Sequence, residues 1–146
     1  MVDITKEDDF TRPKTVERIK LRIEGPGDVF DYSSPCAGGS AWQNLNLRNS
    51  LAAGCDRIVY KLAAHYDLHW KLWAGFAEVV KHCVKCGATV MWEWPRFCTY
   101  WKETRVLNLI RKYRFKFADF GGCMYGLRPV VHMERRSYES LGGSPT

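Results

Sequence analysis

Apolar residues recur at steps of three and four through the middle of the chain and predict one long helix from about Asp56 to Cys86. The apolar side of this helix is formed by Ile58, Leu62, His65, His69, Leu72, Phe76, Val79 and Cys83. Gly87 is expected to end the helix, and Gly75 marks a close contact or a bend, because glycine lowers helix propensity by about 1 kcal/mol. A helix of this length needs a broad surface to lie on, such as a sheet face.

Shorter apolar patterns on both sides predict alternating strands and helices. The expected elements are a strand at 2–4, a helix from 15 that stops before 25, a strand at 28–32, a strand at 88–92, a helix at 104–113 and a strand at 115–120. Residues 40–51 have the pattern of a loop or a broken helix. This order predicts an α/β fold, a three-layer Rossmann-like arrangement with a mostly parallel sheet and flanking helices. One domain is expected over residues 1–134, with a polar and flexible tail at 135–146.

Composition narrows the class of protein. The chain has 146 residues and is 46% hydrophobic, so a folded core is expected. A formal net charge of +6 suits a partner rich in phosphate, such as nucleic acid. Six cysteines are too few for a disulfide scaffold, and the acidic N-terminus does not resemble a signal peptide. With no apolar run long enough to span a bilayer, we predict an intracellular protein without membrane contact.

The strongest candidate for chemistry is Cys36, which follows an extended apolar run and Pro35 and precedes Gly38 and Gly39. Open α/β sheets bind ligands beyond the carboxyl ends of their strands, and this pattern presents a cysteine there. Glu93 ends the next predicted strand, so both side chains are expected at one edge of a parallel sheet. The simpler interpretations are that Cys36 is a small buried hydrophobe and that Glu93 is a structural acid.

These residues carry a resemblance. Ser34-Pro35-Cys36 resembles the Pro-Cys nucleophile motif of DNA cytosine-C5 methyltransferases, and Trp92-Glu93-Trp94-Pro95 resembles their later strand-end glutamate motif. Cys123-Met124-Tyr125-Gly126-Leu127 is similar to a segment of phage-type relatives, and all three motifs are similar to methyltransferase-like segments in mobile-element polyproteins. The order of the motifs agrees over residues 1 to about 130.

The resemblance implies specific roles. Cys36 would attack C6 of an extruded cytosine, Glu93 would hold and protonate N3, and S-adenosylmethionine would supply the methyl group. Pro35, Ser40 and Arg96 are the expected substrate-binding neighbours. Asp3 matches the acidic position near the cofactor adenine.

The chain departs from the family pattern in several places, among them the cofactor loop and the residues after Glu93. The family's glycine-rich cofactor loop lies upstream of the segment that Val2-Asp3-Ile4 matches, and Gly25-Pro26-Gly27 precedes a strand instead of following one. Glu93 is followed by Trp94-Pro95 where cellular enzymes have Asn-Val. We therefore expect an incomplete methyltransferase fold, which the rest of a polyprotein or an oligomer partner would complete. The alternative is a catalytically inactive Rossmann-like domain that binds nucleic acid or protein.

Other patterns leave two interpretations open. Two residue pairs either bind metal or pack in the helix–sheet interface. They are Cys83 and Cys86, which have the spacing of a zinc ligand pair, and His65 and His69, which lie four residues apart. The amide-rich residues 40–51 either read a base or form a solvated loop. The aromatic residues of 92–101 either stack on bases or face the core. The basic run at 111–114 either contacts phosphates or is a solvated helix end.

Overall fold

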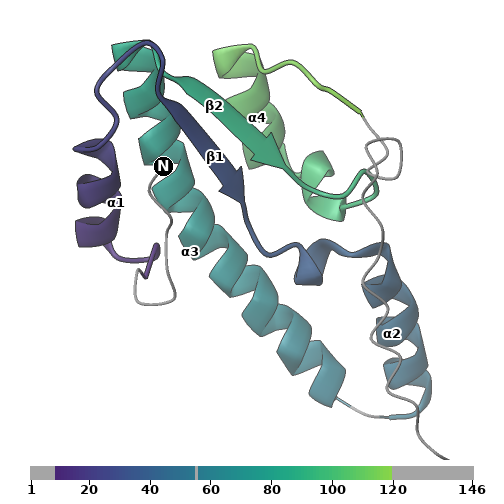
Figure 1. Ribbon diagram of the computed structural model, residues 1–146. Coiled ribbons are helices and arrows are strands. Elements are labelled where there is room, and N and C mark those ends of the chain that lie inside the picture. Colours follow the sequence, from purple (N-terminus) through teal and green to yellow (C-terminus); the bar gives the residue numbers. More distant parts are fainter. Residues whose placement is uncertain (1–8, 55, 120–146) are drawn as a thin grey trace, which may run out of the picture. The chain divides into compact units, whose positions relative to one another are not determined.

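The computed structural model of the chain describes residues 9–54 and 56–119 (Figure 1). Its elements are α1 (Pro13–Lys20), β1 (Val29–Ser33), the short 3₁₀ helix η1 (Ala37–Gly39), α2 (Ala41–Ala52), α3 (Arg57–Cys86), β2 (Thr89–Glu93), the 3₁₀ helix η2 (Thr99–Lys102) and α4 (Thr104–Tyr113). The chain divides into two compact units, residues 1–116 and 117–146, and the first unit holds all of these elements. The predicted strand at 2–4, the domain boundary at 134 and the tail at 135–146 lie outside the described residues.

The two strands pair in parallel, as predicted, with Val29 opposite Thr89 and Ser33 opposite Glu93. Because side chains alternate along a strand, each strand has an inner and an outer face. Phe30 and Tyr32 are buried on the inner face of β1. The Tyr32 ring stacks on Phe76 of α3 with a centroid distance of 4.3 Å. The crossover helix α3 therefore covers the inner face of the pair (Figure 1).

The outer face of the sheet is exposed along both strands. Its residues are Val29, Asp31, Ser33, Thr89, Met91 and Glu93. No helix of the described part covers these positions, so this part of the chain is a mixed α/β structure with a two-stranded parallel sheet and helices on one face. Parallel sheets are usually buried on both faces, because their crossover connections place helices on each side.

The long helix confirms the prediction from periodicity to within one residue at its start. Gly87 ends it in the left-handed region, with φ of 80°, and donates its N–H to the carbonyl of Cys83. Gly75 marks a close contact: a Cβ at this position would lie 2.9 Å from the carbonyl oxygen of Phe10. The N-terminal segment can therefore lie directly on the backbone of α3 at this point.

Two predicted segments were wrong. Residues 40–51 were predicted as a loop or broken helix, but the chain forms the continuous helix α2 at Ala41–Ala52, which packs on α3 and η1. Its polar residues follow no amphipathic pattern, so periodicity could not reveal it. Residues 115–119, where a strand was predicted, are not a strand. Arg114 turns the chain with φ of 55°, and the Phe115 N–H bonds back to Ile110, which ends α4 without bringing a strand to the sheet.

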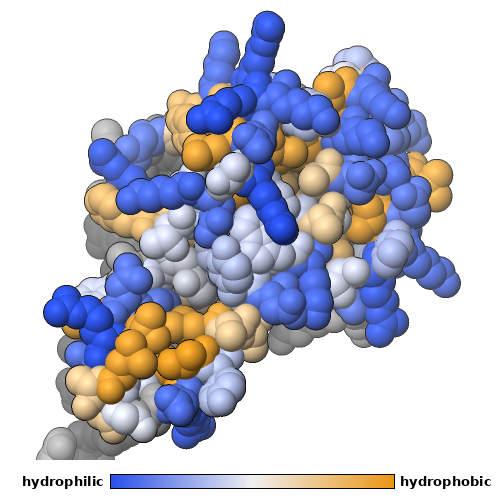
Figure 2. Space-filling view, turned by 180° about the vertical axis from the view of Figure 1, so that it is seen from behind, coloured by the Kyte–Doolittle hydropathy of each residue, from blue (hydrophilic) through white to orange (hydrophobic). Residues whose placement is uncertain are grey.

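The core of the first unit is built largely of aromatic rings. Trp94 and Tyr100 are buried and Trp92 and Trp101 pack against the same cluster, whereas Phe97 is 77% exposed. The interpretation of residues 92–101 as part of the core is therefore confirmed for Trp94 and Tyr100. The face shown in Figure 2 is mostly hydrophilic and carries separate hydrophobic patches. Among the helices described here, none is both long and apolar enough to cross a bilayer.

Candidate active site

The parallel pairing brings the two predicted strand ends together. Ser33 lies opposite Glu93 in the register, so the turn that carries Cys36 and the segment after β2 leave the sheet at the same edge (Figure 1). Directly beyond this edge, the indole N–H of Trp94 donates a buried hydrogen bond of 2.8 Å to the hydroxyl of Ser34. This bond ties the two motifs to each other, because it joins the residues that immediately follow both strands.

Cys36 begins the 3₁₀ turn η1 and is half-buried. Its carbonyl accepts the N–H of Gly39 at 2.9 Å. Gly38 and Gly39 let this turn lie directly on three side chains: a Cβ on Gly38 would overlap the Tyr100 hydroxyl and meet His65, and one on Gly39 would lie 2.7 Å from the Cys98 sulfur. The glycines after Cys36 are therefore required by packing.

Replacing Gly39 with alanine is expected to lower the free energy of unfolding by about 1–3 kcal/mol, the usual cost of overpacking a tight site. The new methyl group would clash with Cys98 and the Tyr100 ring, and both side chains are buried with no space to move away. Urea denaturation followed by tryptophan fluorescence measures the change. Gly25→Ala is the matched control, because the nearest atom to its Cβ is 3.6 Å away. Equal stability of the two variants would contradict the predicted close packing.

Beneath this turn lies a stacked pair of buried rings, His69 from α3 and Tyr100 from η2. Their centroids are 3.8 Å apart and their planes differ by 13°. Neither nitrogen of His69 has a hydrogen-bond partner, and the Tyr100 hydroxyl has none. Burial lowers the pKa of His69 to about 4 and raises the pKa of Tyr100 to about 12, so both rings are neutral at pH 7.

Glu93 lies at the same sheet edge as Cys36 but on the outer face. Its neighbour Trp92 points inward, where its ring lies 5.2 Å from that of Phe76, and alternation turns Glu93 to the opposite side. The Cys36 turn packs on Tyr100 and on His65 of α3, the inner side of the sheet. Within the described residues, the Glu93 carboxylate has no hydrogen bond or ion pair.

The other predicted site residues surround this edge. Pro35 is exposed, and Ser40 is the half-buried N-cap residue of α2, whose hydroxyl makes no capping bond. Arg96 is exposed, with its guanidinium carbon 5.7 Å from the centroid of the Phe97 ring. Asp3 and the motif at 123–127 lie outside the described residues.

The metal interpretations find no support in the part of the chain that the structure describes, where no group of three His, Cys, Asp or Glu side chains could hold an ion. Cys83 is fully buried in the core and burial raises the pKa of its thiol to about 11. His69 is also buried, stacked among aromatic rings. The packing interpretation is therefore confirmed for both residues.

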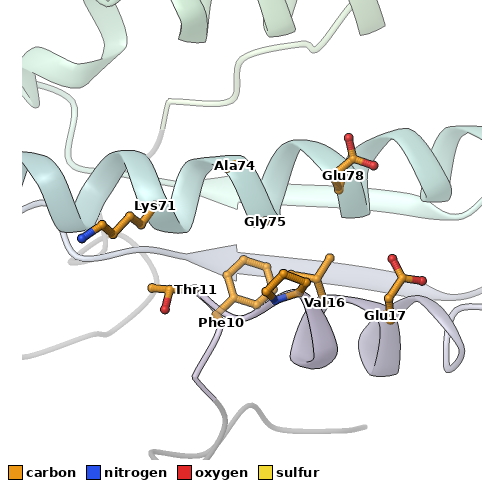
Figure 3. Close-up of a pocket in the computed structure, with 9 residues that line it drawn as sticks. Phe10, Thr11, Val16, Glu17, Lys71, Ala74, Gly75 and Glu78 are labelled. Atoms are coloured by element: carbon orange, nitrogen blue, oxygen red, sulfur yellow. The ribbon is translucent and has the colours of Figure 1, made fainter.

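The sequence did not reveal the neighbours of Cys36. His69 was recognised only as part of the helix stripe and of a possible metal-binding pair, and Tyr100 only as one of the aromatic residues of 92–101. No short-range signal links them, because they come from α3 and from the segment around η2. A second feature was also missed: a groove of about 210 Å³ between α1 and α3, with Phe10 and Val16 facing Gly75 and with Glu17 and Glu78 on opposite sides (Figure 3).

Comparisons with known proteins identify no relative of this chain: no family model, curated protein or solved structure matches it. The case for a function therefore depends on the geometry of the site and on the motifs.

Proposed function

We propose that this chain is the nucleophile-bearing part of a DNA cytosine-C5 methyltransferase-like domain, with Cys36 as the attacking group. The observation that carries the proposal is the position of Cys36, half-exposed in a tight turn beyond the carboxyl end of a parallel strand. Ligands of open parallel sheets bind at this edge. We further propose that the complete fold is three-layered and Rossmann-like, so that additional elements cover the outer sheet face.

The proposed chemistry begins with the thiolate of Cys36. Addition of the sulfur to C6 of a cytosine moves the C5–C6 double-bond electrons toward C4 and the C4–N3 electrons onto N3. N3 takes up a proton, for which Glu93 is the proposed donor. Carbon 5 then has the character of an enamine carbon and can accept an electrophile. Solvent water then removes the C5 proton, the C5–C6 double bond re-forms as the sulfur leaves C6 as a thiolate, and N3 returns its proton to Glu93.

Glu93 constrains how the base would bind. Because its carboxylate is on the outer face, a cytosine that contacts both Glu93 and Cys36 has to lie across the strand ends. Ser40 and Arg96 are the proposed polar contacts of the base and its phosphates at this edge, and Pro35 stiffens the approach to Cys36. The net charge of +6 favours binding to DNA.

The described residues do not fit a site for S-adenosylmethionine. Within the described residues, the one glycine turn that follows a strand toward a helix N-terminus is Gly38–Gly39 between β1 and α2, and it is packed closely on Tyr100, His65 and Cys98; the Gly25–Gly27 turn precedes β1. The proposed steps therefore use only groups of this chain and of the base. A polyprotein neighbour or an oligomer partner is the proposed source of the methyl donor site.

A second function is favoured by the open sheet. Both strands have an unpaired edge within the described residues, and Val29 and Met91 are 58% and 52% exposed on the outer face. Such an edge can take up a strand of another chain. On this reading the chain is a catalytically inactive binding domain in a mobile-element product, recognising nucleic acid or protein.

Hydrogen exchange at C5 of cytosine separates the two functions without any cofactor. Single-stranded DNA is incubated with the protein in D₂O, and mass spectrometry of the released nucleosides counts deuterium at C5. We expect Cys36-dependent exchange that is lost in Cys36→Ser and kept in Cys86→Ser, the matched control at another half-buried cysteine. Glu93→Gln is expected to slow exchange by about 10²–10⁴-fold, the usual contribution of a general acid.

DNA binding without any exchange would contradict the nucleophile role and favour the binding domain. Exchange that persists in Cys36→Ser would contradict the assignment of Cys36. Exchange that is unaffected in Glu93→Gln would remove Glu93 from the mechanism.

A further inference from the structure

Buried polar atoms without a hydrogen bond gather beside Cys36. Four such side-chain atoms occur within the described residues, and three of them belong to His69 and Tyr100. Proteins satisfy nearly all buried polar groups, so each exception calls for a reason, such as a redox or catalytic role. The stacked pair lies directly under the glycine turn that Cys36 begins.

The Tyr100 ring is held in one place. Tyr100 is 1% exposed, His69 stacks on one face, and the rings of Trp94 and Tyr66 lie 5.7 and 6.1 Å away. The hydroxyl reaches the backbone of Gly38, two residues after Cys36, so closely that a Cβ there would overlap it. The end of the phenol therefore lies within the turn that presents the thiol.

The polar groups around Tyr100 differ in whether they can donate a hydrogen bond to the Cys36 sulfur. Tyr100 interacts electrostatically with Cys98, Tyr66, Cys36 and Glu103. The Tyr66 hydroxyl already donates to Glu103 at 3.0 Å, and Glu103 can only accept. Cys98 is a buried thiol, a weak donor, and its pKa is raised by burial. Two histidines adjoin the turn, His65 beside Gly38 and the buried His69, whose ring lies flat against the phenol.

We propose that Tyr100 is a positioning residue for Cys36. The Tyr100 hydroxyl donates a hydrogen bond to the Cys36 sulfur when the Cys36 thiol has lost its proton. The proposed bond requires the sulfur to turn toward the hydroxyl by rotation about the Cα–Cβ bond of Cys36, and the thiol proton goes to solvent. A donor that bonds only the charged form favours that form. The Tyr100 hydroxyl makes no other hydrogen bond, so no existing hydrogen bond has to break when it donates to the sulfur. The inference rests on the proposed function in taking Cys36 as the reactive thiol.

The test is the pH profile of Cys36 alkylation by iodoacetamide, quantified at that site by peptide mass spectrometry between pH 6 and 10. In Tyr100→Phe the midpoint of the profile is expected to move up by about one unit, so that alkylation at pH 7 is about tenfold slower. Tyr66→Phe is the matched control: it removes a hydroxyl from a neighbouring ring that is committed to Glu103, and the midpoint should not move. Tyr100→Phe should be as stable as the unmodified protein or more stable, because its hydroxyl makes no bond.

An unchanged Cys36 profile in Tyr100→Phe would overturn the proposal. An equal shift in Tyr66→Phe would also overturn it, and so would loss of folding in Tyr100→Phe, since the hydroxyl would then carry a structural bond. The experiment contains no DNA, so its outcome is separate from that of C5 exchange. A shifted profile without exchange would retain Tyr100 as the positioning residue of a reactive thiol and reject the action on cytosine.

Discussion

Replacing Phe76 with alanine is expected to lower the free energy of unfolding by about 3–5 kcal/mol, the usual cost of removing a buried phenylalanine. Phe76 is fully buried where α3 crosses the sheet, and its ring contacts those of Tyr32, Phe30, Trp92 and Trp73 at centroid distances of 4.3–6.2 Å. The cavity would remove the ring contacts that Phe76 makes with both strands. Chemical denaturation followed by tryptophan fluorescence measures the loss.

Phe97→Ala is the matched control for this experiment. Phe97 is 77% exposed, and substitutions at such positions usually change stability by less than about 0.5 kcal/mol. If the two variants were equally stable, the helix would not be packed on the inner sheet face through Phe76.

The protein is expected to lose about 2 kcal/mol of stability between pH 7 and pH 5 through His69 alone. Burial lowers the pKa of His69 to about 4 in the folded state, whereas an unfolded histidine titrates near 6.5. Between these values the unfolded chain binds a proton that the folded protein does not, so stability falls as the pH falls through this window. The full loss, reached near pH 4, is about 3 kcal/mol.

His69→Phe isolates this contribution. Phenylalanine keeps a ring between Tyr100 and the neighbouring tryptophans and removes both unbonded nitrogens. We expect the variant to be at least as stable at pH 7 and to lose about 2 kcal/mol less than the unmodified protein on acidification to pH 5. Urea denaturation at both pH values is the measurement. Equal losses in the two proteins would show that His69 is not buried as a neutral ring.

The sequence predicted elements whose signals are local. The apolar stripe and Gly87 predicted α3, because an apolar period and a glycine that ends a helix can both be recognised from residues close together in the sequence. The strand that precedes Cys36 and the one that ends at Glu93 were found in the same way, and their parallel pairing followed from the crossover helix between them. Helix α2 was missed because its position depends on contacts with α3 and η1, not on an apolar stripe of its own.

The candidate site was predictable only in outline. That Cys36 and Glu93 leave the sheet at one edge follows from strand direction, which the order of elements indicates. The face on which Glu93 lies depends on which alternate residues α3 buries, and a shift of one residue would reverse it. Nothing along the chain placed Tyr100 against Gly38, because residues 62 positions apart meet only through the packing of η2 on the Cys36 turn.

By itself, the sequence determined the helix and strand that frame the site, the tight glycine turn after Cys36 and the basic character of the chain, because each depends on residue type and short-range spacing. Only the tertiary structure decided that Glu93 faces outward, that His69 and Tyr100 are buried without hydrogen-bond partners, and that the phenol reaches the Cys36 turn. Burial and desolvation depend on every segment packed around a group, so no local pattern can specify them.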